Sequence, residues 1–155
     1  MVDPGKEDRE VQLVIFQLGR EEFAVEVTQV REIIRMQDIT RMPKAPSFVE
    51  GIINLRGQII AVLDLAQRLS LEAAERGSET RIIVVEAGDV KVGMIVDSVS
   101  EVMRINEDEV EPSPALAVDV EAVYLKGVVK QDNRLIILLD LTRILATEEM
   151  MELSF

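Results

Sequence analysis

The sequence has no cysteine, no histidine and no tryptophan, and only one tyrosine and four phenylalanines among 155 residues. Without cysteine there is no disulfide and no thiolate nucleophile, and without histidine the commonest general base and zinc ligand are also missing. The absence of cysteine is typical of a reducing compartment. Scarce aromatic rings disfavour a stacking surface for bases or sugars. We therefore expect no metal site, no cofactor and no cysteine or histidine catalysis.

Positive charge is also scarce, because 17 basic residues face 29 acidic ones and the net charge is −12. This balance disfavours nucleic acid, whose phosphates require Lys and Arg, and anionic membrane surfaces. The longest aliphatic runs, such as residues 135–139, are far too short to cross a bilayer, and the polar residues 1–10 do not resemble a signal peptide. We expect a soluble cytoplasmic protein with no membrane insertion and a flexible segment over residues 1–10.

What the sequence does contain is an internal repeat. Residues 48–69 align without a gap with residues 124–145, and residues 24–35 align with residues 93–104 in the same order. The matching positions include a glycine, an aspartate and several aliphatic residues. In the longer pair these are Gly51, Ile60, Leu63, Asp64, Leu65 and Leu69, repeated as Gly127, Ile136, Leu139, Asp140, Leu141 and Leu145.

The length of the chain suits one domain, and each repeat alone would be marginal in stability, so we expect the two repeats to share a core. We predict a single domain over residues 11–155, with half-barrels at about 11–75 and 79–147. Short runs rich in Val and Ile, bounded by Gly and charged residues, predict strands throughout. Residues 28–36 fit a helical stripe as well as a strand. Their β-branched content favours a tight turn followed by a strand.

The clearest local signal is a hairpin over residues 51–65, with its turn at Arg56 and Gly57. Glycine supplies the positive φ that a tight turn needs. The second repeat places Asp132 and Asn133 there, and both residue types tolerate the left-handed conformation. Together with the other strands, the two hairpins predict a mainly β protein of two small barrels.

A short helix is expected after each hairpin, at residues 64–71 and at about 140–153. Asp64 and Asp140 stand where an N-cap belongs, and Gln67 three residues after Asp64 completes the pattern of a capping box. The same two carboxylates could instead form a catalytic pair, as in an acid-catalysed hydrolase that uses Asp64. We favour helix capping, because the position fits it in both repeats and no nucleophile with a suitable base is present.

Arg56 is the polar residue that a structural role explains least. Gly57 is accounted for by the turn, whereas an arginine at a hairpin tip adds little to a fold. A planar guanidinium with five donors is well suited to recognising a partner. Surface arginines are nevertheless common, so position alone leaves a contact role and an ordinary surface role open.

These residues resemble the signature of the bacterial chemotaxis coupling protein CheW family. The core of the resemblance is FVEGIINLRG at residues 48–57, followed by the aliphatic run to Leu65. Further matching segments follow in order along nearly the whole chain. They are residues 23–34, 92–102, 111–114, 124–127 and 138–140. The resemblance implies two intertwined five-stranded SH3-like barrels and a non-enzymatic adaptor.

The resemblance also implies roles for particular residues. Glu32, Arg56 and Val102 match positions associated with receptor coupling. Val96 and Val99 are also expected to bind the receptor, since with Val27 they would line an apolar groove between the barrels that receives it. Contact with a kinase is implied for two further residues, Val30 and Gly51. Gly51 has a second interpretation as a glycine that the backbone requires, since Gly127 repeats it. Gly57, Gly127, Asp64 and Asp140 are expected to be structural.

The implied partners are the cytoplasmic signalling tips of methyl-accepting chemoreceptors and the regulatory domain of the chemotaxis histidine kinase. A chain of this kind would be a monomer when free and would be recruited to receptor arrays at the inner face of the membrane. The chain carries no kinase, phosphotransfer or receiver segment, which favours a stand-alone coupler. A coupler for a different sensory histidine-kinase pathway fits the same signature.

Overall fold

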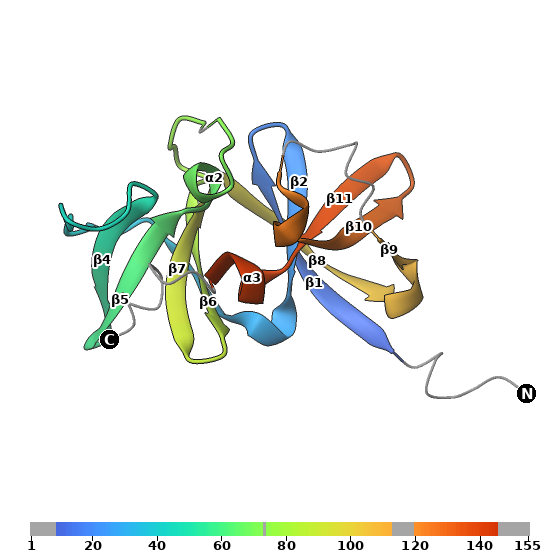
Figure 1. Cartoon of the computed structure of the whole chain (residues 1–155), viewed down its shortest axis with the longest axis horizontal. Coiled ribbons are helices and arrows are strands. Elements are labelled where there is room, and N and C mark those ends of the chain that lie inside the picture. The colour runs from blue at the N-terminus through green and yellow to red at the C-terminus, as the bar shows by residue number, and fades with distance from the viewer. Residues whose placement is uncertain (1–8, 73, 113–119, 146–155) are drawn as a thin grey trace, which may run out of the picture.

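The computed structural model describes residues 9–72, 74–112 and 120–145. Nearly all of the segment predicted to be flexible, and the predicted helix beyond residue 145, lie outside these residues. Two β-sheets stand side by side, with few and short helices (Figure 1). The prediction of a mainly β fold is therefore confirmed.

The first sheet has six strands in the order β8-β1-β2-β11-β10-β9. Its strands are β1 (Glu10–Leu18), β2 (Glu21–Glu26), β8 (Ser98–Asn106), β9 (Val110–Glu111), β10 (Leu125–Gln131) and β11 (Arg134–Leu139). The second sheet has five strands in the order β3-β6-β7-β5-β4. Its strands are β3 (Val30–Arg35), β4 (Val49–Leu55), β5 (Gln58–Asp64), β6 (Arg81–Ala87) and β7 (Val90–Val96).

Within the described residues the helical elements are all short. They are η1 (Val27–Gln29), α2 (Leu65–Arg68), η2 (Glu107–Glu109), η3 (Ala122–Tyr124) and α3 (Leu141–Leu145). A turn followed by a strand was predicted for residues 28–36, and η1 followed by β3 confirms it. The predicted hairpins are also present, as β4–β5 and β10–β11.

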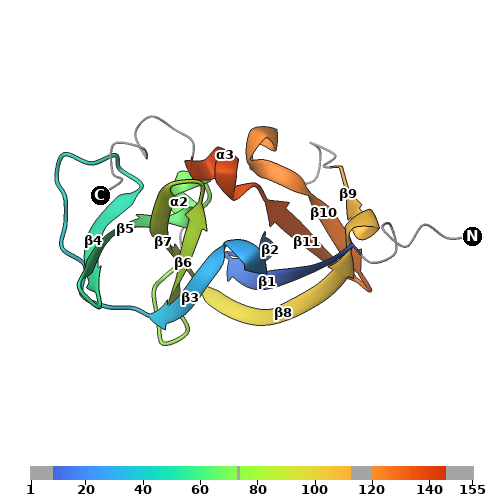
Figure 2. The same cartoon turned by 90° about the horizontal axis from the view of Figure 1, so that it is seen from below.

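Each repeat contributes strands to both sheets. The first hairpin of the chain, β1–β2, joins the C-terminal strands, and β2 pairs in parallel with β11. In the same way β6–β7 joins the strands of the first repeat, and β7 pairs in parallel with β5. Figure 2 shows β1 and β2 in one body with β10 and β11, although these strands lie at opposite ends of the chain. The barrels are therefore intertwined, as the resemblance implied.

The repeat extends to backbone irregularities. The pairing of β3 with β6 skips Arg31, and the pairing of β8 with β1 skips Ser100, which occupies the same place in the second repeat. Such bulges bend a strand and increase its twist. We call two residues that occupy the same place in the two repeats equivalent. One departure is β9, because in the second sheet an isolated bridge between Thr40 and Ile52 takes its place.

The apolar core has three parts. A central cluster of 23 buried residues joins the two sheets and includes Phe16, Phe23 and Met94. Each sheet also encloses a smaller cluster of seven residues. Burial of apolar side chains dominates stability in a protein of this size, so the central cluster holds the two sheets together.

The aspartate half of the predicted helix capping is present, but the reciprocal half of the capping box is not. The Asp64 carboxylate accepts a hydrogen bond from the Gln67 amide at 3.3 Å, and Asp140 does the same for Arg143 at 3.2 Å. The reciprocal half of the capping box is wrong, because the Asp64 amide donates to the Phe48 carbonyl instead. The helix also ends at Arg68, earlier than predicted.

Ser70 explains this early end of α2. Its φ is +60°, and its amide donates to the Gln67 carbonyl while the Leu71 amide donates to that of Ala66. These two bonds form a Schellman motif, which stops a helix by turning the chain left-handed. A serine in this position is not among the usual sequence signals, so the pattern of apolar residues alone did not reveal the stop.

Candidate functional site

The tip of the β4–β5 hairpin reaches across to β3 and forms the most exposed charged contact of the predicted site. Arg56 has a φ of +52° and Gly57 a φ of +87°, the sign pattern of a type I′ turn. The Asn54 side chain accepts a hydrogen bond from the Gly57 amide at 2.8 Å and holds this turn. The Arg56 guanidinium then donates two hydrogen bonds to the Glu32 carboxylate.

This contact leaves a charged surface available to a partner. The Arg56 side chain is 72% exposed, whereas that of Glu32 is 27% exposed. Hydrogen bonding to Arg56 lowers the pKa of the Glu32 carboxyl, and Lys91 adds a smaller electrostatic effect in the same direction. The same hydrogen bond raises the pKa of Arg56. Two of the predicted receptor-contact residues are thus brought together, which sequence spacing did not indicate.

The equivalent end of the first sheet carries a different charge pattern. Glu101 is equivalent to Glu32, but Asp132 stands where Arg56 does, and Glu22 stands where Lys91 does. There Arg134, equivalent to Gln58, forms two hydrogen bonds with Glu22 at 2.9 and 3.0 Å and lies 3.5 Å from Glu101. Hydrogen bonding to Glu22 raises the pKa of Arg134.

The two corresponding ends are therefore unlike in charge, although both hairpin turns have a positive φ at their first turn residue, Arg56 and Asp132. Lys91, Glu22 and Arg134 were not among the predicted site residues. Extending the two alignments of the internal repeat would have identified them as positions where the repeats differ in charge. A partner that binds one end would meet a different set of charges at the other.

Exposed apolar residues also come in equivalent pairs. Val102 on β8 is 58% exposed, and its equivalent Ile33 on β3 is 40% exposed. Val102 stands opposite Val14 and Ile33 stands opposite Ile83, and both partners belong to the central cluster. Because opposed residues in an antiparallel pair share a face, Val102 and Ile33 extend the face of the central cluster into solvent. Ile33 was not among the predicted contact residues.

The remaining valines differ in accessibility. Val99 and its equivalent Val30 are partly buried and pack against the central cluster, as does Val27. Val96 is different, because it is fully buried within that cluster at 0% exposure. The expectation that Val96 lines a groove is wrong, since its side chain is a core residue that no partner can reach. The resemblance had implied a groove position for both Val96 and its equivalent Val27, but Val27 is only partly buried.

Gly51 is required by the backbone. A Cβ at this residue would lie 2.0 Å from the Thr40 carbonyl oxygen, and its φ is +152°. A Cβ at the equivalent Gly127 would lie 2.5 Å from the Glu111 carbonyl oxygen. In both repeats a neighbouring segment crosses directly over the glycine. Gly51 itself is buried, so the segment at Thr40 forms the accessible surface above it.

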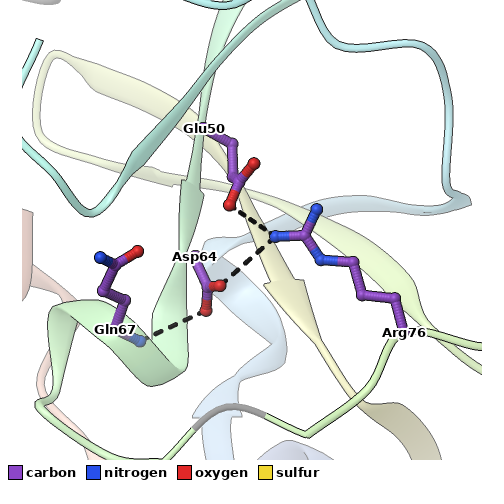
Figure 3. A network of polar contacts seen from close by, with 4 residues as sticks. All are labelled: Glu50, Asp64, Gln67 and Arg76. Atoms are coloured by element: carbon purple, nitrogen blue, oxygen red, sulfur yellow. Dashed lines mark hydrogen bonds and ion pairs between the residues drawn. The ribbon is translucent and has the colours of Figure 1, made fainter.

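Asp64 lies in a closed polar network rather than in an open site. Arg76 Nη2 is 2.6 Å from Glu50 and 3.3 Å from Asp64, while the other oxygen of Asp64 caps α2 (Figure 3). Hydrogen bonds and the charges of both carboxylates raise the pKa of Arg76 against the opposing effect of its burial. The carboxylate of Asp64 is thus committed to a cation and a helix end. This arrangement supports the capping interpretation.

Within the three described stretches, no group of three or more acidic side chains is placed to hold a metal ion. None of the helices in those stretches is both long and apolar enough to span a membrane. What the site offers is a charged hairpin tip, exposed apolar residues on β3 and β8, and a backbone crossing at Gly51. Such features suit contact with other proteins.

Comparison with known proteins agrees with this geometry. Residues 12–149 match the CheW-like domain family. The chain is 38% identical over 136 residues to the chemotaxis protein CheW of Bacillus subtilis, covering 88% of this chain and 87% of that protein. It is 39% identical over 137 residues to the chemotaxis protein CheW of Thermotoga maritima, covering 88% and 89%.

A solved structure gives the same result at the level of the fold. The crystal structure of scaffolding protein TtCheW from Thermoanaerobacter tengcongensis superposes with a TM-score of 0.83 and 35% identity, covering 90% of each chain. The hydrolase alternative is therefore wrong. The chain belongs to the CheW-like domain family and is a non-enzymatic coupling adaptor of chemotaxis.

Proposed function

We propose that this adaptor binds the cytoplasmic signalling tips of chemoreceptors on one surface and the regulatory domain of the chemotaxis histidine kinase on another. The observation that carries the proposal is the Glu32–Arg56 contact on the same strand as exposed Ile33. β3, an edge strand, thus presents the ion pair on one face and, at the next residue, an exposed apolar side chain on the other. A receptor tip is a helical bundle, and its apolar stripe would pack on the face of Ile33 and Val102 while its polar groups reach the exposed Arg56 past the edge of β3.

The kinase contact is proposed for the region of Val30 and Gly51. Gly51 lies beneath the segment that crosses at Thr40, so its effect on a partner is indirect. An open hollow is bordered by residues 41–43 and 45–47 of the same connection, together with Val49, Glu50 and Gln67. A regulatory domain would contact this exposed connection, whose placement depends on the glycine below it.

An adaptor of this kind needs two correctly placed binding surfaces and catalyses no reaction. It transmits a signal when its affinity for one partner depends on the state of the other. Because the equivalent hairpin ends carry unlike charges, a receptor tip that meets Arg56 would not find the same charges at the end of the first sheet. Recruitment to receptor arrays in the cytoplasm follows from the receptor contact, and the free protein is a monomer in this proposal.

The experiment is isothermal calorimetry of the protein with a chemoreceptor tip fragment and, separately, with a kinase regulatory domain. Arg56→Ala should weaken receptor binding about tenfold, as expected of an arginine at the centre of an interface, and leave kinase binding unchanged. Asp132→Ala, at the equivalent turn of the other hairpin, is the matched control and should change neither. Binding of the unaltered protein to neither partner would contradict the proposal and favour a different sensory pathway.

A further inference from the structure

Arg68, the last residue of α2, connects the two repeats through side-chain contacts. Its guanidinium carbon lies 4.9 Å from the ring centre of Phe48 and 4.9 Å from that of Tyr124. These two aromatic residues are equivalent to each other in the repeats. A guanidinium over an aromatic ring is attracted by the negative face of the ring, more strongly where water is excluded. Arg68 thus contacts the same position of both repeats at once.

The hydrogen bonds of Arg68 cross the same boundary. Nη1 donates to the Tyr124 hydroxyl at 2.8 Å, and Nη2 donates to the Ile144 carbonyl oxygen at 3.1 Å. Ile144 stands 76 residues further along the chain and is the equivalent of Arg68. The chain therefore places an arginine in one repeat and an isoleucine at the equivalent place in the other, and the arginine side chain donates across this boundary to both Tyr124 and Ile144.

The aromatic residues are themselves fixed to the two helix starts. The Phe48 carbonyl accepts a hydrogen bond from the Asp64 amide at 2.8 Å, and the Tyr124 carbonyl accepts one from the Asp140 amide at 2.9 Å. Each aspartate caps the helix of its own repeat. Arg68 is therefore linked indirectly, through Phe48 and Tyr124, to the start of both helices.

These contacts differ in kind from those of the central cluster. Apolar burial is strong but has no preferred direction, so it holds two sheets together without fixing one angle between them. Hydrogen bonds from a planar guanidinium do have a preferred direction, and lysine cannot reproduce the geometry. Arg68 Nε is buried and has no hydrogen-bond partner among the described residues. Leaving such a group unpaired is costly, which indicates that the position of the guanidinium is set by its other contacts.

We infer that Arg68 is a positioning residue that fixes the placement of one sheet relative to the other and so couples the partner surfaces on them. The coupling part of this inference rests on the proposed function. The positioning part concerns the free protein alone. Val102 lies on the first sheet, whereas Ile33 and Arg56 lie on the second, so their relative placement depends on the contact between sheets.

The positioning part can be tested without any partner. Because the chain has no cysteine, spin labels can be introduced at Asp89→Cys, in the turn of the second sheet, and Asn133→Cys, in a turn of the first. Pulsed electron paramagnetic resonance then gives the distribution of distances between sheets. We expect Arg68→Met to broaden this distribution and shift its mean by about 2 Å, the size of typical interface shifts. Arg143→Met, at an exposed position of α3, is the matched control and should leave it unchanged.

A milder variant keeps the test decisive if Arg68→Met does not fold. Tyr124→Phe removes one hydrogen bond and keeps the ring, so it should broaden the distribution less than Arg68→Met. Arg68→Lys should give an intermediate width, because it keeps the charge and loses the planar donors. Distributions that coincide with that of the parent protein in every folded variant would overturn the inference.

Coupling is measured in a second arm. The affinity for the kinase regulatory domain is determined with and without a saturating receptor fragment, in the parent protein and in Arg68→Lys. We expect the ratio of the two affinities to fall toward one in the variant while each partner alone still binds. An unchanged ratio would overturn the coupling role. Absence of binding to both partners by the parent protein would instead contradict the proposed function and leave the distance result standing.

Discussion

The Arg56 guanidinium donates to the Glu32 carboxylate across 24 residues of sequence, with one of the two bonds 3.1 Å long. The contact predicts how Glu32 titrates. Its pKa is lowered in the folded protein, chiefly by the hydrogen bond from Arg56. A lowered carboxyl pKa means that the pair is fully formed above the ordinary glutamate value of about 4.3 and is lost as pH falls through the folded value.

Carboxyl chemical shifts from nuclear magnetic resonance would check this titration. In Arg56→Ala the Glu32 midpoint should move up toward its ordinary value. A midpoint that stays in place would show that the ion pair is absent in solution. Glu101, which has a different set of neighbours, serves as an internal reference.

Arg56→Ala should leave the fold intact. The side chain is largely exposed, and exposed ion pairs contribute little to stability because water screens them. We expect the thermal midpoint to stay the same within the error of calorimetry. A sharp drop would mean that Arg56 is structural and that its assignment to receptor contact fails.

Truncation of Val96 should lower stability, whereas truncation of Val102 should mainly weaken receptor binding. Val96→Ala should lower the free energy of unfolding by about 2 kcal/mol, because it leaves a cavity in the central cluster. Val102→Ala, at 58% exposure, should change it by less than about 0.5 kcal/mol and weaken receptor binding. Urea denaturation measures the first effect and calorimetry the second. Equal destabilisation by both variants would contradict the burial described here.

Gly51→Ala should be strongly destabilising. The added carbon would overlap the Thr40 carbonyl, and backbone cannot move aside as a flexible side chain can. We expect a loss of about 3 kcal/mol or more, in the range seen for overpacking and backbone strain. Gly77→Ala is the control, since open space surrounds a Cβ there. Denaturation curves that coincide for the two variants would refute the crossing at Thr40.

Asp64 and Asp140 allow a cap and an ion pair to be measured separately. Either aspartate changed to alanine should lose about 1 kcal/mol of stability as a helix cap. Asp64→Ala should lose more than Asp140→Ala, because Asp64 also contacts Arg76. When Arg76→Ala is also present, Asp64→Ala and Asp140→Ala should lower the stability by equal amounts. Asp64→Asn should cost only a few tenths of a kcal/mol, since asparagine caps a helix equally well.

Local patterns in the sequence identified much of this fold. Both hairpins follow from the gapless repeat, and the caps follow from the aspartates that end them. The partner of each strand could not be read in this way, since β2 with β11 and β5 with β7 pair across distant parts of the chain. The intertwined arrangement came from family resemblance and not from spacing.

The errors have the same physical origin. Val96 and Val99 read alike in sequence, and only the packing of two sheets decides that one is core and the other is at its margin. The capping box at Gln67 failed because the Asp64 amide finds a distant carbonyl at Phe48. In each case a long-range contact overrode a local pattern, and long-range contacts have no local signature.

The exchange of hairpins between the sheets sets the order in which the protein is completed during synthesis. The β1–β2 hairpin is synthesised before the other strands of both sheets, yet Glu22 of β2 can pair with Ile136 only after β3 to β10 have been made. The second sheet needs only β3 to β7 and closes earlier. The β1–β2 hairpin therefore exposes unpaired strand edges for longer than the strands of the second sheet do. Its charged side chains, Glu10, Glu21, Glu22 and Glu26, are the kind that protect such edges from aggregation.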